Sequence, residues 1–313
     1  MSRRLILPEE DEVMRHARAL LREADVGHKL PTPVDDLIEC AGLVVSDDVT
    51  LDEEHQEFFK LQEEYVKGLN ASSHGTLESA LKKMLGLIDL RDSVIYLDRG
   101  VTEQKQAFLK LHEVGHKVLP WQRATYMFLD DDRTLSPKVA ALYEREANRF
   151  AADALFQGDR FTRQSRDLPL DIETPLSLAR QYGSSAHAAI RRYVEVSHRC
   201  CSALVMRTSE VDAGGDPEIR VVYTIRSPKF AEQFEEFTWP RQLSSDSVLA
   251  TVLMTGGQHF KGDGLMLPDR DGRPTECGFH IFRTSWGSFA LVFPLSETLR
   301  RSRNKIRNRR IRL

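Results

Sequence analysis

The chain has 313 residues, enough for two or three domains, and its 41% hydrophobic and 29% charged residues are typical of a globular protein with a substantial core. Its formal net charge of −3 gives no overall attraction to nucleic acid, and no apolar run approaches the roughly 20 residues of a membrane span. The N-terminus turns acidic directly after its first positive charges, so we expect no signal peptide, no membrane association, a cytoplasmic location and four reduced cysteines.

The first part of the chain alternates helical and strand patterns. Residues 8–26 have apolar side chains at helical spacing, which predicts an amphipathic helix. Its inward-facing positions are Val13, Ala17, Leu20, Leu21 and Ala24. A short helix over residues 34–41, which Thr32 is placed to cap, and a strand at residues 43–45 are expected next.

Two further helices and a β-hairpin are predicted after this strand. Residues 52–68 and 77–85 have charged and apolar side chains at helical spacing. Apolar runs at residues 87–90 and 94–97 flank the sequence Arg-Asp-Ser, and this arrangement predicts two paired strands with a turn between them.

The most informative segment is a largely buried helix predicted over residues 103–119, which carries His112, Glu113 and His116. Positions four apart lie on the same face of an α-helix, so the two imidazoles can bind one Zn²⁺ at about 2.0–2.1 Å. Glu113 lies about 100° further round the helix, within reach of a water molecule at such an ion. This H-E-x-x-H pattern is typical of zinc-dependent peptide hydrolysis. The alternative is a surface helix with two histidines by chance, but the apolar flanks favour burial, which is costly for these groups without partners.

A zinc site of this type needs a third protein ligand and leaves the fourth position to water. The helix predicted over residues 140–155 offers Glu144 and Glu146. Glu144 extends the buried apolar stripe and is favoured, whereas Glu146 lies closer to the solvent side and is the alternative ligand. Asn148 shares the face of Glu144 and can hold the carboxylate or a histidine in place by a hydrogen bond. Without a metal, both acids would form solvated ion pairs with neighbouring arginines.

The segment between these two helices, residues 121–138, is expected to be a long connection. Its acidic triplet at residues 130–132 predicts a solvated loop, with a second cation site or an electrostatic gate as the alternative. The sequence does not identify the donor that would stabilise an oxyanion; Tyr126, Tyr143 and an imidazole from elsewhere in the chain are candidates.

The sequence Leu-His-Glu-Val-Gly-His at residues 111–116, followed by Glu-Arg-Glu-Ala-Asn-Arg-Phe-Ala-Ala at residues 144–152, resembles the ImmA/IrrE metallopeptidase family. The entry segment at residues 30–45 and the strand at residues 92–97 agree, and the resemblance extends over roughly residues 8–200. One departure lies at residues 154–157, where Ala-Leu-Phe-Gln replaces the Leu-Leu-Met-Pro often found in the family.

The resemblance implies a zincin-like metalloendopeptidase of the gluzincin type. It implies His112, His116 and Glu144 as metal ligands and Glu113 as the general base, with Zn²⁺ as the cofactor, although Mn²⁺ can occupy similar ligand sets. Relatives cleave helix–turn–helix repressors at specific sites and so relieve repression, after stress or in mobile elements. A protein substrate of this kind is therefore expected. The alternatives are a non-proteolytic DNA-binding transcriptional regulator and a toxin–antitoxin type component with a structural metal.

Residues 176–193 have a helix–turn–helix pattern. One helix ends near Gly183, and Ser184 or Ser185 can cap the next. Because the second helix carries two adjacent arginines, DNA recognition is one interpretation. Two packed core helices are the favoured interpretation, since the chain has no net basic charge.

The C-terminal part, residues 199–295, is predicted to be a separate α/β unit. Its strand candidates are residues 200–206, 219–225, 259–266, 278–283 and 289–293, and residues 245–254 form a short helix. This mix resembles sensor folds of the GAF class, so a small-molecule or other signal is expected here. The tail that follows holds eight basic residues in fourteen and is either a solvated end or a contact for an acidic surface.

These patterns together predict an α+β fold in several parts. A mainly helical peptidase domain covers residues 1–165, a helix–turn–helix-like segment residues 166–198, a GAF-like α/β domain residues 199–299, and a basic tail residues 300–313.

Overall fold

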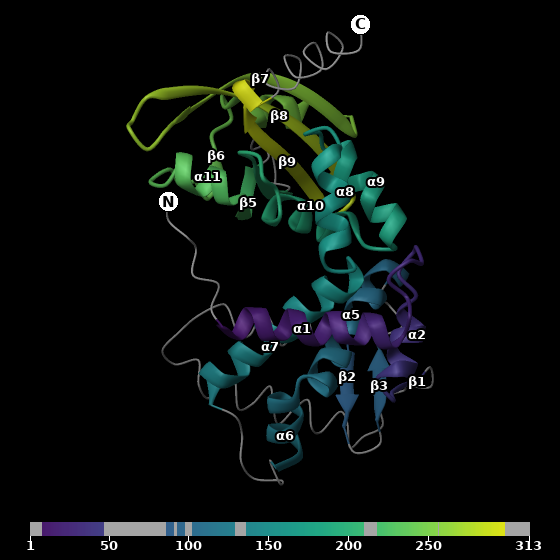
Figure 1. Ribbon diagram of the computed structural model, residues 1–313. Helices are drawn as coiled ribbons and strands as arrows, with labels where there is room; N and C mark the ends of the chain where they lie inside the picture. The colour runs from purple at the N-terminus through teal and green to yellow at the C-terminus, as the bar shows by residue number, and fades with distance from the viewer. Residues whose placement is uncertain are drawn as a thin grey trace, which may run out of the picture. The chain divides into compact units, whose positions relative to one another are not determined.

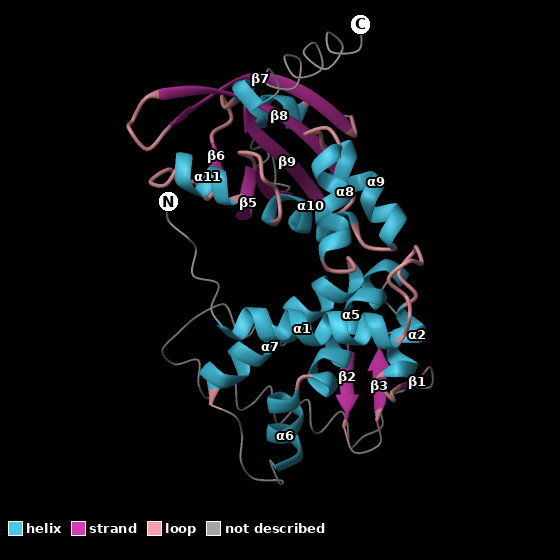
Figure 2. Ribbon diagram, viewed as in Figure 1, coloured by secondary structure: helices cyan, strands magenta, loops and turns pink. Residues whose placement is uncertain are grey.

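The computed structural model describes residues 8–46, 86–90, 93–97, 102–128, 136–209, 218–255 and 257–297, which form two compact units (Figures 1 and 2). The first unit comprises Met1–Asp159 and Gln181–Ser185, and the second comprises Arg160–Arg180 and Ala186–Leu313. The helices predicted at residues 52–68 and 77–85, the acidic triplet at 130–132 and the basic tail lie outside the described residues. The four-part division drawn from the sequence stays a prediction.

The first unit packs helices against a small mixed sheet (Figure 1). Its described helices are α1 (Pro8–Glu23), α2 (Val34–Cys40), α5 (Glu103–Val118), α6 (Pro120–Phe128) and α7 (Pro137–Leu155). Its described strands are β1 (Val44–Ser46), β2 (Gly86–Asp89) and β3 (Val94–Leu97). The sheet has the order β1-β3-β2, with β1 parallel and β2 antiparallel to β3, so the predicted hairpin is confirmed.

Helix α7 packs against both α1 and α5. The inward positions predicted for α1 are confirmed at Val13, Ala17, Leu20 and Leu21, which are all buried. Helix α5 also contacts β2 and β3, so it lies between the sheet and α7. The helix that carries the histidines is therefore covered on more than one side.

The predicted capping role of Thr32 is wrong. Pro33 occupies the N-cap position of α2, and no side chain caps this helix. The Thr32 hydroxyl instead donates to the main-chain carbonyl of Leu155 at the end of α7, at 2.7 Å. A buried carbonyl at a helix end needs a hydrogen-bond donor from outside the helix, whereas the N–H groups at an accessible helix N-terminus can bond to water.

The second unit is built on one antiparallel sheet of six strands in the order β6-β5-β4-β9-β8-β7. The strands are β4 (Ser202–Ser209), β5 (Glu218–Arg226), β6 (Gln242–Leu243), β7 (His259–Pro268), β8 (Pro274–Thr284) and β9 (Gly287–Pro294). The helices are α8 (Asp159–Asp167), α9 (Glu173–Tyr182), α10 (Ala186–Glu195), α11 (Pro228–Gln233) and α12 (Val248–Met254), and the first two extend partly into the other unit's residues. All five predicted strands and the predicted helix are present, whereas β6 and α11 are additions. The sheet is compatible with a sensor domain, and the GAF-like assignment stays a prediction.

Helices α9 and α10 form the predicted two-helix pattern, and Gly183 between them has the expected left-handed conformation, with φ of 71°. Helix α10 packs on β4 and β5. Its Arg192 is only 4% exposed, and Arg191 forms an ion pair with Glu195 at 2.9 Å. Since a recognition helix must present its basic side chains to the groove, this burial favours the packed-helix interpretation.

Among the described helices, none is both long and apolar enough to cross a membrane. The four cysteines are free, as predicted for reduced thiols. Burial raises the pKa of the Cys277 thiol to about 12, with a further contribution from Glu276, so this thiol is unreactive near neutral pH.

Asp171 joins the start of α9 to the sheet of the second unit. Its carboxylate accepts a hydrogen bond from the Glu173 main-chain N–H at 3.1 Å and pairs with Lys261 of β7 at 2.5 Å. The ring nitrogen Nδ1 of His280 on β8 lies 3.2 Å away. Burial raises the pKa of Asp171, but the hydrogen bonds from Lys261 and Glu173 outweigh it and hold this pKa below its usual value.

We expect Asp171→Asn to lower the free energy of unfolding by roughly 0.5–1.5 kcal/mol at pH 7, because the amide keeps an acceptor for α9 but loses the charge that attracts Lys261. The pKa of Asp171 is lower in the folded protein than in the unfolded chain. Its carboxylate therefore stabilises the folded state above the unfolded pKa of about 3.9, and this contribution is lost as pH falls through the lower folded value. Urea unfolding of wild type and variant should therefore converge in acid. Asp263→Asn, at an exposed position of β7, is the matched control. A difference between wild type and Asp171→Asn that stayed constant down to pH 2.5 would contradict the assignment.

Candidate metal centre

Helix α5 places the motif residues at a buried position of the first unit. His112 and His116 lie one turn apart, and their side chains are 12% and 7% exposed. Glu113, between them in the sequence, is also buried. The helix forms because many side chains of residues 103–118 have a high helix propensity and the apolar ones recur at helical spacing. It ends before Pro120, which begins α6.

Helices α5 and α7 approach each other closely at Gly115. A Cβ atom added to Gly115 would lie 3.2 Å from the Cα atom of Ala147 and 3.3 Å from the Cβ atom of Phe150, both on α7. Glycine on one helix and alanine on the other therefore permit a separation that larger side chains would prevent. Glu144 lies one turn before Ala147, so the same approach brings its carboxylate to the histidines.

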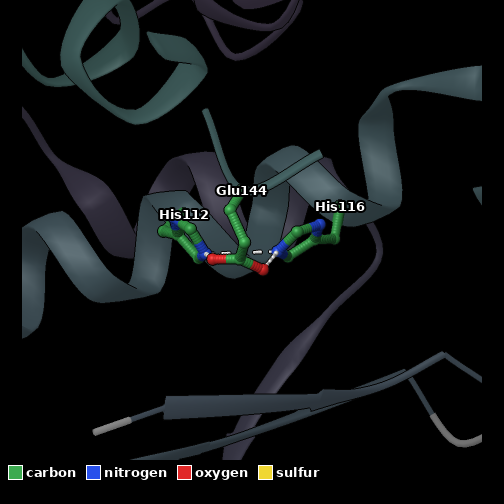
Figure 3. A group of neighbouring side chains, drawn as sticks. All are labelled: His112, His116 and Glu144. Carbon is green, nitrogen blue, oxygen red and sulfur yellow. Dashed lines mark hydrogen bonds and ion pairs between the residues drawn. The ribbon is translucent and has the colours of Figure 1, made fainter. Parts of the chain in front are cut away.

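The carboxylate of Glu144 lies between the two imidazoles (Figure 3). Its two oxygens are 3.3 Å from Nε2 of His112 and 3.5 Å from Nε2 of His116, and the two Nε2 atoms are 3.1 Å apart. Ligand atoms of a tetrahedral zinc ion, each about 2.0–2.1 Å from the metal, are about 3.4 Å from one another. The nearest Glu144 oxygen differs for the two imidazoles, and one ligand atom from each of the three residues lies within 4.8 Å of the others, so the donor types and their proximity are compatible with a zinc ion held by two imidazoles and one carboxylate.

The three groups are strongly coupled electrostatically. Burial raises the pKa of Glu144, but hydrogen bonds from His112 and His116 outweigh it and hold this pKa well below its usual range. Burial lowers the pKa of His116, and the bond with Glu144 together with the charge of Glu113 more than compensates, so the net shift is upward. A cation bound here would have to displace the imidazole proton, which makes its affinity fall in acid.

Glu113 differs from Glu144 in its surroundings. Burial raises the pKa of its carboxyl group, the two histidines partly oppose this, and the charge of Glu144 raises it further. Its side chain is thus a stronger base than an exposed glutamate, as suits a group that accepts a proton near neutral pH.

The burial predicted for the two acids of α7 is reversed: the side chain of Glu144 is 50% exposed and does not extend the buried stripe, and the predicted position of Glu146 near solvent is wrong. Glu146 is only 8% exposed, and its Oε2 atom accepts hydrogen bonds from Nε1 of Trp121 at 2.7 Å and from Nε2 of Gln122 at 2.6 Å. These donors belong to α6, in the segment that the sequence predicts as a connection. Because α6 covers this face of α7, Glu146 is engaged there and lies outside the group formed by His112, His116 and Glu144.

Three other polar residues complete the comparison with the sequence. Asn148 donates to the main-chain carbonyl of Glu144 at 2.7 Å, so the predicted bond to a ligand side chain is not observed. The Tyr143 hydroxyl lies 2.8 Å from Oγ1 of Thr125, while the side chain of Tyr126 lies outside the described residues.

Gln122, which the sequence does not single out, contacts Nδ1 of His116 at 2.7 Å. Its only local signal is that it follows the proline that begins α6.

Comparison with known proteins identifies a family match that includes the candidate centre. Residues 57–193 match the Peptidase_M78 family, described as the IrrE N-terminal-like domain, and this range contains the whole candidate centre. A Mycobacterium tuberculosis transcriptional regulator of known structure is similar, with a TM-score of 0.53, 14% identity, and coverage of 91% of this chain and 77% of that chain. At this identity the likeness concerns the fold alone. No curated protein matches the chain.

We expect Gly115→Ala to lower the free energy of unfolding by about 1 kcal/mol, because overpacking costs about 1–3 kcal/mol and the better helix propensity of alanine offsets about 1 kcal/mol. It should also weaken zinc binding about tenfold, because a wider helix crossing moves Glu144 away from the imidazoles. Urea unfolding and competition with a zinc chelator measure the two effects. Gly27→Ala is the matched control, since a Cβ atom there would meet nothing within 4 Å. Equal zinc affinities of wild type and Gly115→Ala would contradict the proposed role of the close crossing.

Proposed function

Because the chain carries the IrrE N-terminal-like domain of the ImmA/IrrE family over residues 57–193, we propose that it is a zinc-dependent endopeptidase that cleaves a helix–turn–helix transcriptional repressor. The observation that carries the proposal is the convergence of His112, His116 and Glu144, whose ligand atoms all lie within 4.8 Å of one another. Zinc is preferred for two imidazoles and one carboxylate, and Mn²⁺ is the second candidate.

Each residue of the centre has a defined task in this proposal. His112, His116 and Glu144 hold the ion, which when bound acts as a Lewis acid and makes water acidic enough to be a nucleophile near neutral pH. Glu113 accepts the proton from the attacking water and delivers it to the leaving amine of the cleaved peptide. Its buried position keeps bulk water away from the carboxylate and supports this role as a base.

The substrate class rests on the family and on one structural neighbour. Members of the ImmA/IrrE family cleave helix–turn–helix repressors, and the similar solved structure is named a transcriptional regulator. The second unit, with its six-stranded sheet, is proposed to receive the signal that starts cleavage, in a stress response or in a mobile element. A DNA-binding regulator without proteolytic activity has less support, since α10 buries Arg192.

We expect Glu113→Gln to keep its zinc but to lose about 10²–10⁴-fold in cleavage rate, because the amide cannot accept the proton. The substrates to test are purified helix–turn–helix repressors from the genomic neighbourhood of the gene, with zinc content measured on the same samples. Glu103→Gln, at an exposed position in the first turn of the same helix, is the control and should cleave normally. Wild-type turnover by Glu113→Gln would remove Glu113 from the mechanism.

We expect Glu144→Ala to weaken zinc binding at least about 100-fold, because it removes a direct ligand, whereas loss of an outer hydrogen bond costs about 10–100-fold. Glu146→Ala should have the smaller effect on zinc affinity, since its carboxylate contacts α6 instead of the imidazoles. Chelator competition measures both variants at the same pH. A larger loss in Glu146→Ala than in Glu144→Ala would identify Glu146 as the third ligand.

A further inference from the structure

Gln122 connects three helices of the first unit through one buried side-chain amide. It lies on α6 and is completely buried. Its Oε1 atom is 2.7 Å from Nδ1 of His116 on α5. Its Nε2 atom is 3.2 Å from the main-chain carbonyl of Tyr143 and 2.6 Å from Oε2 of Glu146, both on α7. All the polar atoms of the Gln122 side chain are therefore engaged.

The partners of Gln122 determine which way its amide group points. The main-chain carbonyl of Tyr143 can only accept a hydrogen bond. The Oε2 atom of Glu146 accepts a hydrogen bond from Nε1 of Trp121, and a carboxylate oxygen can accept a second one from another N–H group. The reversed amide would place an oxygen against these two acceptor oxygens in a buried site, where such repulsion is costly. Both Nε2 hydrogens are thus used on α7, and Oε1 faces His116.

This orientation also determines the tautomer of His116. The Oε1 atom of Gln122 has no hydrogen, so Nδ1 of His116 must donate in the bond between them. A neutral imidazole with its proton on Nδ1 has a free lone pair on Nε2. Nε2 is the atom that lies 3.5 Å from Glu144 and 3.1 Å from Nε2 of His112. The lone pair therefore faces the place where the donor atoms of the candidate centre converge.

We propose that Gln122, held by Glu146 and Tyr143, is a positioning residue that keeps His116 in the Nδ1-protonated tautomer required for metal binding. The inference rests on the proposed metal centre and assigns a task to two residues outside its ligand set. Glu146 holds the amide in the productive orientation, and Trp121 in turn holds Glu146. The start of α6 thus completes the surroundings of a ligand that belongs to α5.

The direct test is the tautomer of His116 in the full-length, metal-free protein. Nitrogen-15 NMR distinguishes a protonated ring nitrogen from a bare one, and His116→Gln identifies the signal. At alkaline pH, where His116 is neutral, we expect the proton on Nδ1 in the wild type and a mixture of tautomers in Gln122→Ala. A wild-type His116 with its proton on Nε2 would overturn the proposal.

Zinc affinity provides the second readout. Gln122→Ala should bind zinc about 10–100-fold more weakly than wild type in chelator competition. Thr125→Val is the matched control, because Thr125 lies one turn further along α6 and bonds to Tyr143 and Trp121 without touching a ligand. It should lose stability but keep the wild-type affinity. Equal affinities of Gln122→Ala and Thr125→Val would overturn the positioning role, even if both variants were destabilised.

An exchange of side chains separates positioning from mere packing. Gln122→Glu alone sets two carboxylates against each other and should bind zinc weakly. Adding Glu146→Gln restores a donor at position 146 and an acceptor toward His116, so the double variant should bind zinc about tenfold more tightly than Gln122→Glu alone. No recovery in the folded double variant would contradict the inference.

The outcomes for the two proposals are distinguishable. A wild-type protein that binds no zinc would refute the proposed function. The tautomer measurement needs no metal, so it would still decide whether Gln122 positions His116. Conversely, tight zinc binding that is indifferent to Gln122 would refute only the positioning role.

Discussion

The close approach of α5 and α7 at Gly115 and Ala147 is the constraint on which the site depends. The missing side chain of Gly115 lets the Cα atom of Ala147 and the ring of Phe150 pack directly against α5. Glu144, one turn away on α7, thereby reaches both imidazoles. All three donors lie on regular helices that are packed on several sides, so their positions do not depend on a loop. Such rigid support is what a centre with a defined donor spacing needs.

This packing also concentrates charge in a poorly solvated place. Glu113 and His116 are both buried, and Glu144 is partly buried beside them. Burial raises the pKa of both Glu113 and Glu144, and the imidazoles lower both. For Glu113 burial prevails, whereas for Glu144 the direct hydrogen bonds from the imidazoles outweigh it. Two carboxylates of the same type thus acquire different properties, one as a candidate ligand and the other as a candidate base.

Local patterns predicted the elements of the site, while contacts between distant elements were only partly predictable. The spacing of His112 and His116 follows from helix geometry, so their shared face could be inferred without a structure. Glu144 does lie beside the histidines, as predicted, but its side chain is half exposed, so it does not extend the buried apolar stripe on which that prediction was based. The burial of Glu146 could not be inferred, because it depends on α6, whose position over α7 has no local signal. For the same reason Gln122 was missed. In the second unit, β6 and α11 were too short to produce a recognisable period.

A helix–turn–helix pattern alone does not distinguish a DNA-binding element from two core helices. Both need a short turn with a left-handed residue, which Gly183 provides, and both have apolar inner faces. The difference lies in the basic side chains, and here Arg192 is buried while Arg191 pairs with Glu195. The histidine motif is different, because the structure adds an independent condition that chance would rarely meet. Residues separated by some thirty positions, on two helices, bring their potential ligand atoms within 4.8 Å of one another. Function is therefore better argued from the arrangement of these side chains than from the fold that holds them.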